Sequence, residues 1–444
     1  MDLLGVRNLP YLARRNYYYE FLHLIPWGLL TGVVEGNLSA IVVAKTFRGG
    51  DLLVATASAT PVGALFLSMA FGMISVGRPK LRLSMLYCAG TAICVMSVAL
   101  VPRTEWGGIL FVIQMALAQV FLCGVVTLRG ALWKRNYPVR ARGLITARLQ
   151  ALRMLAGVVT LLLLPALFDL DPNWYRATYA ATGLAGVVAV ILLRKMRVRH
   201  EKSELAGAGR TTEDEALERM GLWEALWPIS VLARAWRILR GDAAFTRYLV
   251  AQMLLGIGVH MVVPVMVITL DETFAYYWIS AVLVEVIPQV ATFGSLRRWG
   301  PFFDRVPLPR FRVYTSLAAA VGMIFGMVAT IAVTGEGGVR EAIAFPLAAL
   351  LFALRGVAHG VQRGGASLAW NLGHLHFSSG GDAELYLGVH MSLTGIRAIV
   401  GPFLGVGLAQ AMGWGVWGVG CGLCLLSARE FHQMARQESD GQMR

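Results

Sequence analysis

Several polar side chains lie deep inside stretches of the sequence that are otherwise apolar. Those that could bind a solute there are Glu35, Asn37, His260, Arg355, His359 and Gln362. An ionisable group at the centre of a bilayer costs about 3 kcal/mol, so a residue of this kind is a candidate functional site by default. Carboxyl and imidazole groups in such places can also exchange protons, which makes Glu35, Glu285 and His260 candidate proton-binding sites.

Arginines outnumber acids in these apolar stretches. The deep arginines are Arg153, Arg355 and Arg397, and the deep acids are Glu35 and Glu285. A cavity with surplus positive charge attracts anions because its low-dielectric walls focus the field. The sequence therefore favours an anionic solute, such as an organic acid or a phosphorylated metabolite.

Each of these residues also has a purely structural interpretation. The two acids could neutralise arginines within a helix bundle, and His260 could be a donor that holds two helices together. Function is favoured more strongly for Arg355, His359 and Gln362, because their spacing places costly side chains on one face of a helix.

The composition indicates a membrane protein. Of the 444 residues, 57% are hydrophobic and 15% are charged, and the mean hydropathy is +0.61. A soluble domain carries about 25% charged residues, so the polar surface of a soluble protein is missing. The net charge of +14 comes mostly from Lys and Arg in short segments between apolar runs, which a membrane explains better than a nucleic-acid partner.

Other sequence signals are absent or weak. The first twenty residues have no uninterrupted apolar segment, so we expect no cleaved signal peptide. No P-loop pattern occurs, which argues against ATP-driven pumping by this chain. Cys421 and Cys424 lie in a glycine-rich apolar run without nearby histidines. We expect no metal site, no cofactor and no catalytic residues.

Apolar runs of about 20 residues predict twelve membrane-spanning helices. Their approximate limits are 21–44, 52–76, 82–101, 107–132, 143–168, 174–195, 245–270, 273–296, 312–334, 342–371, 384–411 and 413–428. Lys and Arg are concentrated in alternate connecting segments, which by the positive-inside rule puts both termini in the cytoplasm. The expected fold is an all-α integral membrane protein of the cytoplasmic (inner) membrane, multi-pass and monomeric.

A charged segment divides the predicted spans into two sets of six. Residues 196–243 begin with a charged stretch and continue as "LWEALWPISVLARAWRILRG". This mixture of arginine with apolar residues is typical of a helix lying on the bilayer surface, and a linker packed on the protein itself is the alternative. The predicted domains are a six-helix bundle over 1–195, this cytoplasmic linker over 196–243, and a second six-helix bundle over 244–444.

The two predicted bundles contain related segments. Aligning "LQALRMLAG" (149–157) with "LTGIRAIVG" (393–401) pairs Arg153 with Arg397. Two further pairs of segments are similar: "RGALW" with "RGGASLAW", ending at Trp133 and Trp370, and "FGMISVGRPKLR" (71–82) with "WGPFFDRVPLPRFR" (299–312). Internal repeats of this kind are common in secondary transporters.

With twelve spans, a long central linker and two related halves, the chain resembles the major facilitator superfamily (MFS). The segment after the eighth span also fits the family's G-x-x-x-D-R loop signature, with Gly300, Asp304 and Arg305. The first-half copy keeps Gly72 and Arg78 but has no acid at the corresponding place. The resemblance implies that these residues form a latch between the halves on the cytoplasmic side, although the first-half copy is degenerate.

The resemblance also implies how the spans are arranged. The first, fourth, seventh and tenth spans would line a central cavity, where the candidate solute-binding residues converge. Arg153 and Arg397, in the fifth and eleventh spans, would hold contacts between helices or halves that exchange during alternating access.

The predicted function is secondary active transport of a small solute by alternating access, with an anionic solute and proton coupling favoured. One alternative is a sensor or assembly partner of the same fold that does not transport. A lesser alternative is a polytopic membrane enzyme, because a cluster of potentially catalytic groups occurs between His374 and Glu384. The expected partners are the lipid bilayer, the solute and protons, with no nucleic acid.

Overall fold

The computed structural model describes residues 11–199, 228–335, 341–377 and 383–440. Every regular element in these residues is helical. The first part of the chain contains α1 (Tyr11–Val34), α2 (Leu38–Lys45), α3 (Asp51–Gly63), η1 (Ala64–Leu67), α4 (Ser68–Ile74), α5 (Lys80–Ser97), η2 (Val98–Leu100), α6 (Glu105–Asn136), α7 (Val139–Leu170) and α8 (Trp174–Leu193). The second part contains α12 (Pro228–Gly241), α13 (Ala243–Thr273), α14 (Tyr277–Ala281), the π-helical turn η3 (Val282–Val286), α15 (Ile287–Phe303), α16 (Leu308–Val333), α17 (Glu341–Leu372), η4 (Gly373–His376), α18 (Ala383–Met412) and α19 (Gly415–Ser439).

The lengths of these helices suit a bilayer. Among the described residues, ten helices are long and apolar enough to cross a membrane, and α1 and α2, bent by 48° at their junction, make an eleventh if they count as one span. A helix satisfies its own backbone hydrogen bonds, which lipid cannot do. The expected all-helical, multi-pass membrane architecture is confirmed. The helix α19, which occupies the place of the twelfth expected span, does not meet the same criterion.

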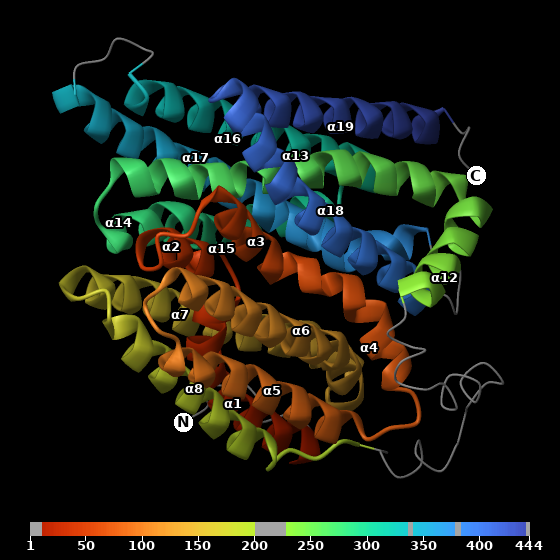
Figure 1. Cartoon of the computed structure of the whole chain (residues 1–444). Coiled ribbons are helices and arrows are strands. Elements are labelled where there is room, and N and C mark those ends of the chain that lie inside the picture. Colours follow the sequence, from red (N-terminus) through yellow and green to blue (C-terminus); the bar gives the residue numbers. More distant parts are fainter. Residues whose placement is uncertain (1–10, 200–227, 336–340, 378–382, 441–444) are drawn as a thin grey trace.

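The helices form two bundles that lie side by side along their length (Figure 1). In the first bundle α1 packs on α7 and α8, and α5 packs on α6 and α8; in the second, α16 packs on α17 and α19, and α13 packs on α18 and α19. Contacts between the bundles run along α18, which lies against α3, η1 and α4. A second contact joins α7 to α14 and the π-helical turn.

Four of the expected spans are not continuous α-helices, and the third span is one of them, because it ends in the 3₁₀ turn η2. The first is broken between Val34 and Leu38, the second contains the 3₁₀ turn η1, and the eighth contains the π-helical turn η3. The eighth span also begins and ends later than the predicted 273–296, because it runs over Tyr277–Phe303. A broken helix inside a bilayer is tolerated only where other protein groups satisfy the freed backbone.

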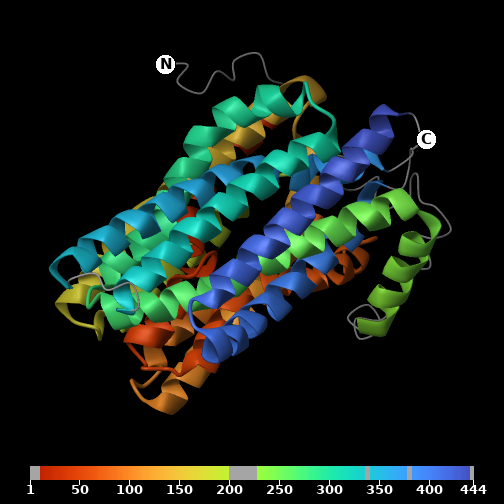
Figure 2. The ribbon, with the colours of Figure 1, turned by 90° about the horizontal axis from the view of Figure 1, so that it is seen from above.

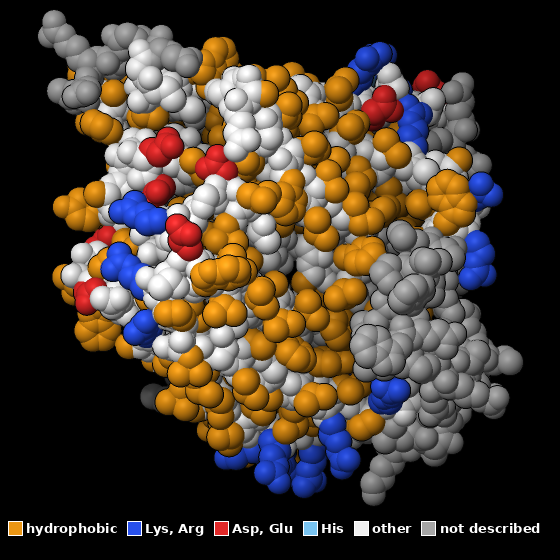
Figure 3. Space-filling view, in the orientation of Figure 1, with side chains coloured by type: hydrophobic (Ala, Val, Ile, Leu, Met, Phe, Trp, Pro, Cys, Tyr) orange, Lys and Arg blue, Asp and Glu red, His pale blue; other side chains and the backbone are white. Residues whose placement is uncertain are grey.

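The surface of the molecule agrees with a membrane location. Hydrophobic side chains cover the middle of the face in Figure 3, and charged side chains gather towards its edges. The linker helix α12 lies at one end of α13 (Figure 2), and its Ala235 is buried against the second bundle. Its Trp236 is exposed, and the guanidinium of Arg240 lies 4.7 Å from the Trp236 ring centroid. The charged part of the linker before Pro228 lies outside the described residues from position 200 on.

The packing of α18 on the first bundle depends on a glycine. A Cβ atom at Gly395 would lie 2.8 Å from the Cα atom of Phe66 and 2.9 Å from the carbonyl oxygen of Gly63. We expect Gly395→Ala to lower the free energy of unfolding by about 1–3 kcal/mol, because the backbones must move apart. Thermal unfolding of the purified protein in detergent would measure this.

The same helix supplies the control. Gly407 has no atom within 4 Å of the place where a Cβ would be. Gly407→Ala should therefore leave the stability unchanged within about 0.5 kcal/mol, or raise it slightly through its helix propensity. Equal effects of the two substitutions would contradict the proposed close contact.

Candidate functional site

The break between α1 and α2 exposes backbone groups that other helices satisfy. The side chain of Gln119, on α6, donates to the carbonyl oxygen of Val34. On the other side of the break, the backbone N–H of Asn37 donates to the carboxylate of Glu285, 2.7 Å away in the second bundle. Gly36 lies between them with a φ of +120°, a value that favours glycine. The break is thus completed by both bundles.

Glu285 joins the two bundles at this point. It lies in the π-helical turn η3, is buried, and also accepts a hydrogen bond of 2.8 Å from the side-chain amide of Asn37. A Cβ at Gly36 would lie 2.9 Å from the Glu285 carboxylate, so only glycine permits this approach. π-helical turns are frequent at functional sites because they re-aim a side chain.

Glu35 lies beside the break and forms an ion pair with Arg153 of α7. The same guanidinium donates to Thr31, and its Nε donates over 3.0 Å to Gln150. Gln150 also accepts a hydrogen bond of 3.4 Å from Arg129 of α6. The Glu35 side chain is 33% exposed, so water or a solute can reach this carboxylate.

Residues of the second bundle lie close to this network. The charge of Arg363, on α17, acts on Glu35 of the first bundle and on both His260 and His359 of the second. Arg363 is exposed, and the two histidines are partly exposed. The charges of Arg129 and Arg363 therefore act on the Glu35 carboxylate in addition to that of Arg153, which pairs with it directly.

Two further candidates from the sequence occupy different surroundings. Arg355 is only 3% exposed, and its guanidinium lies 5.9 Å from the ring centroid of Trp417 on α19. Its charge interacts with Glu285. Gln362 is also buried. Arg363 acts on Glu35, His260 and His359, and Arg355 acts on both His359 and Glu285, while Asn37 bonds to Glu285.

The bundles are also joined at the end that the positive-inside prediction puts outside the cell. Lys45 donates to the carbonyl oxygen of Phe274 and lies 3.4 Å from a carboxylate oxygen of Asp271. The carboxylate of Asp169, at the end of α7, accepts hydrogen bonds from the backbone N–H groups of Tyr277 (2.6 Å) and Trp278 (3.0 Å) at the start of α14. An acid at a helix N-terminus is favoured by the helix dipole.

The opposite end of the molecule carries the loop with the G-x-x-x-D-R signature. Asp304 and Arg305 follow α15, and both are exposed. Their backbone N–H groups bond to Gly300 and Phe302 within the same turn. In the first bundle, Gly72 lies in α4 and Arg78 bonds through its backbone to Ser75. Each of these backbone bonds lies within one bundle.

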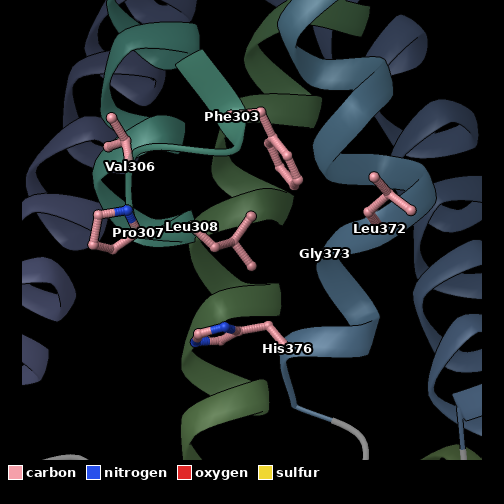
Figure 4. A pocket seen from close by; sticks show the side chains of 7 residues that line it. All are labelled: Phe303, Val306, Pro307, Leu308, Leu372, Gly373 and His376. Carbon is pink, nitrogen blue, oxygen red and sulfur yellow. The ribbon is translucent and has the colours of Figure 1, made fainter. Parts of the chain in front are cut away.

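A pocket of about 340 Å³ lies beside this loop (Figure 4). Its lining is mostly apolar and consists of Phe303, Val306, Pro307, Leu308, Leu372, Gly373 and His376. The imidazole of His376 lies 3.6 Å from a carboxylate oxygen of Glu438 on α19. Asp382, part of the cluster that suggested a membrane enzyme, lies outside the described residues. The pocket contains none of the candidate solute-binding residues.

The two arginines of the internal repeat make different contacts. Arg153 joins α7 to α1 through a carboxylate, and is partly exposed. Arg397 joins α18 to α13 by donating to the backbone carbonyl oxygen of Gln252, 2.7 Å away, and is buried. Each arginine connects helices within its own bundle.

Two arginines of the site were not among the sequence candidates. Arg129 and Arg363 are the first residues of the repeated "RGALW" and "RGGASLAW" segments. The repeat is therefore the available signal. By itself the repeat indicates architecture alone, and Arg129 lies near the end of its predicted span, where positive charge is expected for topology.

Solved structures with the same arrangement of helices are transporters. The inward-open, partially occluded xylose transporter XylE from E. coli superimposes with a TM-score of 0.63 and 14% sequence identity, over 94% of this chain and 97% of that one. A mutant of the nucleoside transporter NupG superimposes with a TM-score of 0.60 and 12% sequence identity, over 95% of this chain and 99% of that one. A POT family transporter superimposes with a TM-score of 0.58 and 9% sequence identity, over 96% of both chains.

No family model and no curated protein sequence matches the chain. The structural likeness, which extends over nearly the whole length of each of these proteins, therefore carries the assignment. At these identities it concerns the fold, and it agrees with the resemblance in the sequence. The chain has the fold of the major facilitator superfamily transporters.

Proposed function

We propose that the protein is a secondary active transporter that carries a small solute across the cytoplasmic membrane by alternating access. The fold supports this, since the solved proteins that share it are described as transporters of xylose and nucleosides. The protein works as a monomer within the lipid bilayer, without a cofactor or nucleic acid. The two bundles are the moving parts, and the linker of residues 196–243 connects them.

The contacts between the bundles support an inward-open state. Asp169, Lys45 and Thr46 tie the bundles together at the proposed outer end. The signature loop at the proposed inner end makes backbone bonds within its own turn. In the proposed inward-open state the latch of Gly72, Arg78, Gly300, Asp304 and Arg305 is apart, while α4 stays packed against α18. It closes when the outer contacts open.

The solute is an anion, and the observation that carries this proposal is the group of three arginines around Glu35. Arg153 is neutralised by its ion pair with Glu35, whereas Arg129 and Arg363 add positive charge to the same region. Arginine binds carboxylates and phosphates through forked, charge-assisted hydrogen bonds. Arg363 comes from the second bundle, so an anion between it and Arg129 would draw the two bundles together.

The remaining candidates are assigned different tasks. His260 and His359, close to Arg363, are proposed to contact the solute, and Gln362 to support them. Asn37 and Arg355 hold Glu285, which couples the break in the first span to the second bundle. Arg153 and Arg397 are proposed to exchange helix contacts during the transport cycle, each within its own bundle.

Proton coupling is proposed to act through Glu35. Its carboxylate is accessible and holds Arg153, so protonation would release that arginine for an anionic solute. Glu285 is the second candidate; it is buried and engaged with Asn37, so it changes state only if the bundles separate. His260 lies in the field of Arg363 and Arg397, which disfavours a second positive charge there.

Ligand screening would test the anion proposal. Carboxylates and phosphates should raise the thermal stability of the purified protein, because a ligand that binds the folded state stabilises it. Arg363→Gln should weaken binding of such a ligand about 10–100-fold, since a charge-assisted hydrogen bond contributes about 1.5–3 kcal/mol. Titration of each purified protein with the best ligand would give both dissociation constants.

Arg298→Gln is the matched control for this substitution. Arg298 is exposed on α15, and it is not part of the group around Glu35. Its replacement should leave the dissociation constant unchanged. Ligands confined to neutral sugars or nucleosides would contradict the anion proposal while leaving transport intact. The absence of flux for every solute in proteoliposomes, together with a stable complex with another protein, would favour a sensor.

Glu35→Gln tests proton coupling. The amide cannot release a proton, so accumulation of solute driven by a pH gradient should be lost. Exchange of labelled for unlabelled solute without a gradient should persist, because that process needs no net proton movement. The control is Glu430→Gln on α19, because Glu430 pairs with Arg247. This variant should retain both activities. Gradient-driven accumulation by the Glu35→Gln protein would show that the coupling site is elsewhere.

A further inference from the structure

Two buried arginines of the second bundle share one glutamine. Arg312, on α16, donates through Nη2 to the side-chain oxygen of Gln252, on α13. Arg397, on α18, donates through Nη1 to the backbone carbonyl oxygen of the same residue, 2.7 Å away. The side chains are 2% and 9% exposed. Two full positive charges are therefore held beside one neutral residue in the interior of the bundle.

Several polar atoms around these arginines have no hydrogen-bond partner in the described residues. They are Nε and Nη1 of Arg312, Nε of Arg397, the hydroxyl of Tyr248 and Nε2 of His390. Tyr248 and His390 are both buried, and each interacts electrostatically with both arginines. Buried polar atoms are satisfied in most native proteins, so a group of unpaired donors needs a physical explanation.

A balancing carboxylate is also missing from this cluster. No Asp or Glu of the described ranges forms an ion pair with Arg312 or Arg397. The ring centroid of Phe431 lies 5.3 Å from Cζ of Arg312. The adjacent acid, Glu430, pairs with Arg247 instead of Arg312. The two arginines also repel each other. Buried charges without partners are strongly destabilising, so this arrangement requires negative charge from outside the chain.

We propose that Arg312, Arg397, Tyr248 and His390 form an internal site for a small inorganic anion of the size of chloride. The unpaired N–H and O–H groups supply donors, and the two guanidinium groups supply the charge. The anion would bridge α13, α16 and α18, and so hold the second bundle together. This site lies around Gln252 and not around Glu35, although the charge of Arg397 also acts on His260 of the proposed solute site.

The packing around the cluster argues for a single-atom ion. A Cβ atom at Gly256 would lie 2.8 Å from Cζ of Arg397, and one at Gly373 would lie 2.8 Å from the hydroxyl of Tyr248. The helices around the cluster are therefore closely packed at these two glycines, which favours a compact ion over a polyatomic one. Chloride fits such a site better than the larger sulfate or phosphate, which serve as size controls.

Thermal unfolding of the full-length protein in detergent would test the site. The buffers would contain chloride, sulfate, phosphate or gluconate at a matched ionic strength of about 0.15 M. Chloride should raise the melting temperature by about 2 °C or more relative to gluconate, in a saturable way, because it binds only the folded state. Gluconate, sulfate and phosphate could also bind the proposed solute site, so the comparison is repeated in the Arg363→Gln protein, where chloride should still raise the melting temperature relative to all three.

Gln252→Glu provides an internal anion in place of chloride. The new carboxylate would lie beside Arg312, so the melting temperature in gluconate should rise and the shift caused by chloride should disappear. Gln119→Glu is the matched control. Gln119 and Gln252 are both 3% exposed, but Gln119 contacts a backbone carbonyl oxygen and no arginine. Its replacement should lower the stability and preserve the shift caused by chloride.

Arg312→Met removes one of the two charges and should also abolish the chloride shift, while Arg247→Gln, at a partly exposed ion pair with Glu430, should preserve it. A wild-type protein with the same stability in chloride and gluconate would overturn the proposal. A full chloride shift in the Gln252→Glu protein would do so as well. Since none of these measurements uses transport, their outcome is independent of the proposed function.

Discussion

A polar group within a bilayer has no water to bond with, and this constraint explains how the two bundles are joined. The break between α1 and α2 frees the carbonyl group of Val34 and the N–H group of Asn37. Gln119 satisfies the first group from within the same bundle. Glu285 satisfies the second from the other bundle, so a local requirement of one helix becomes a contact between the two halves.

This contact determines much of the nearby geometry. Gly36 must adopt a positive φ and leave room for the Glu285 carboxylate, and the π-helical turn directs that carboxylate towards the break. Glu35 is left free to pair with Arg153. Two acids that look equivalent in the sequence therefore differ: one is buried at an interface between bundles, and the other is accessible.

The arginines divide in a similar way. Arg153 and Arg129 are linked through the Glu35 carboxylate, the Gln150 side chain and the Thr31 hydroxyl group of the first bundle. Arg312 and Arg397 lie inside one bundle, with a glutamine as their shared partner. The sequence repeat that pairs Arg153 with Arg397 therefore preserves a position in the fold, whereas their contacts differ because α1 offers a carboxylate and α13 offers a backbone carbonyl oxygen.

The helical membrane fold was predictable from the sequence. The length of the apolar segments and the spacing of charged residues are local properties, and they determine which segments insert into a bilayer. The repeat around Arg153 and Arg397 and the loop at Gly300, Asp304 and Arg305 were enough to indicate the superfamily's architecture. The break after Val34 and the π-helical turn were not predicted, because each is stabilised by residues far away in the chain.

The sequence by itself determined which residues are costly in a membrane, and so which ones need a partner. Only the tertiary structure decided which partner each one has. Glu35 and Glu285 are both acids in apolar helices, and nothing in their local sequence assigns one to Arg153 and the other to Asn37. Electrostatic and hydrogen-bond energies depend on distance and burial in three dimensions, and the packing of α7, η3 and α17 sets those distances.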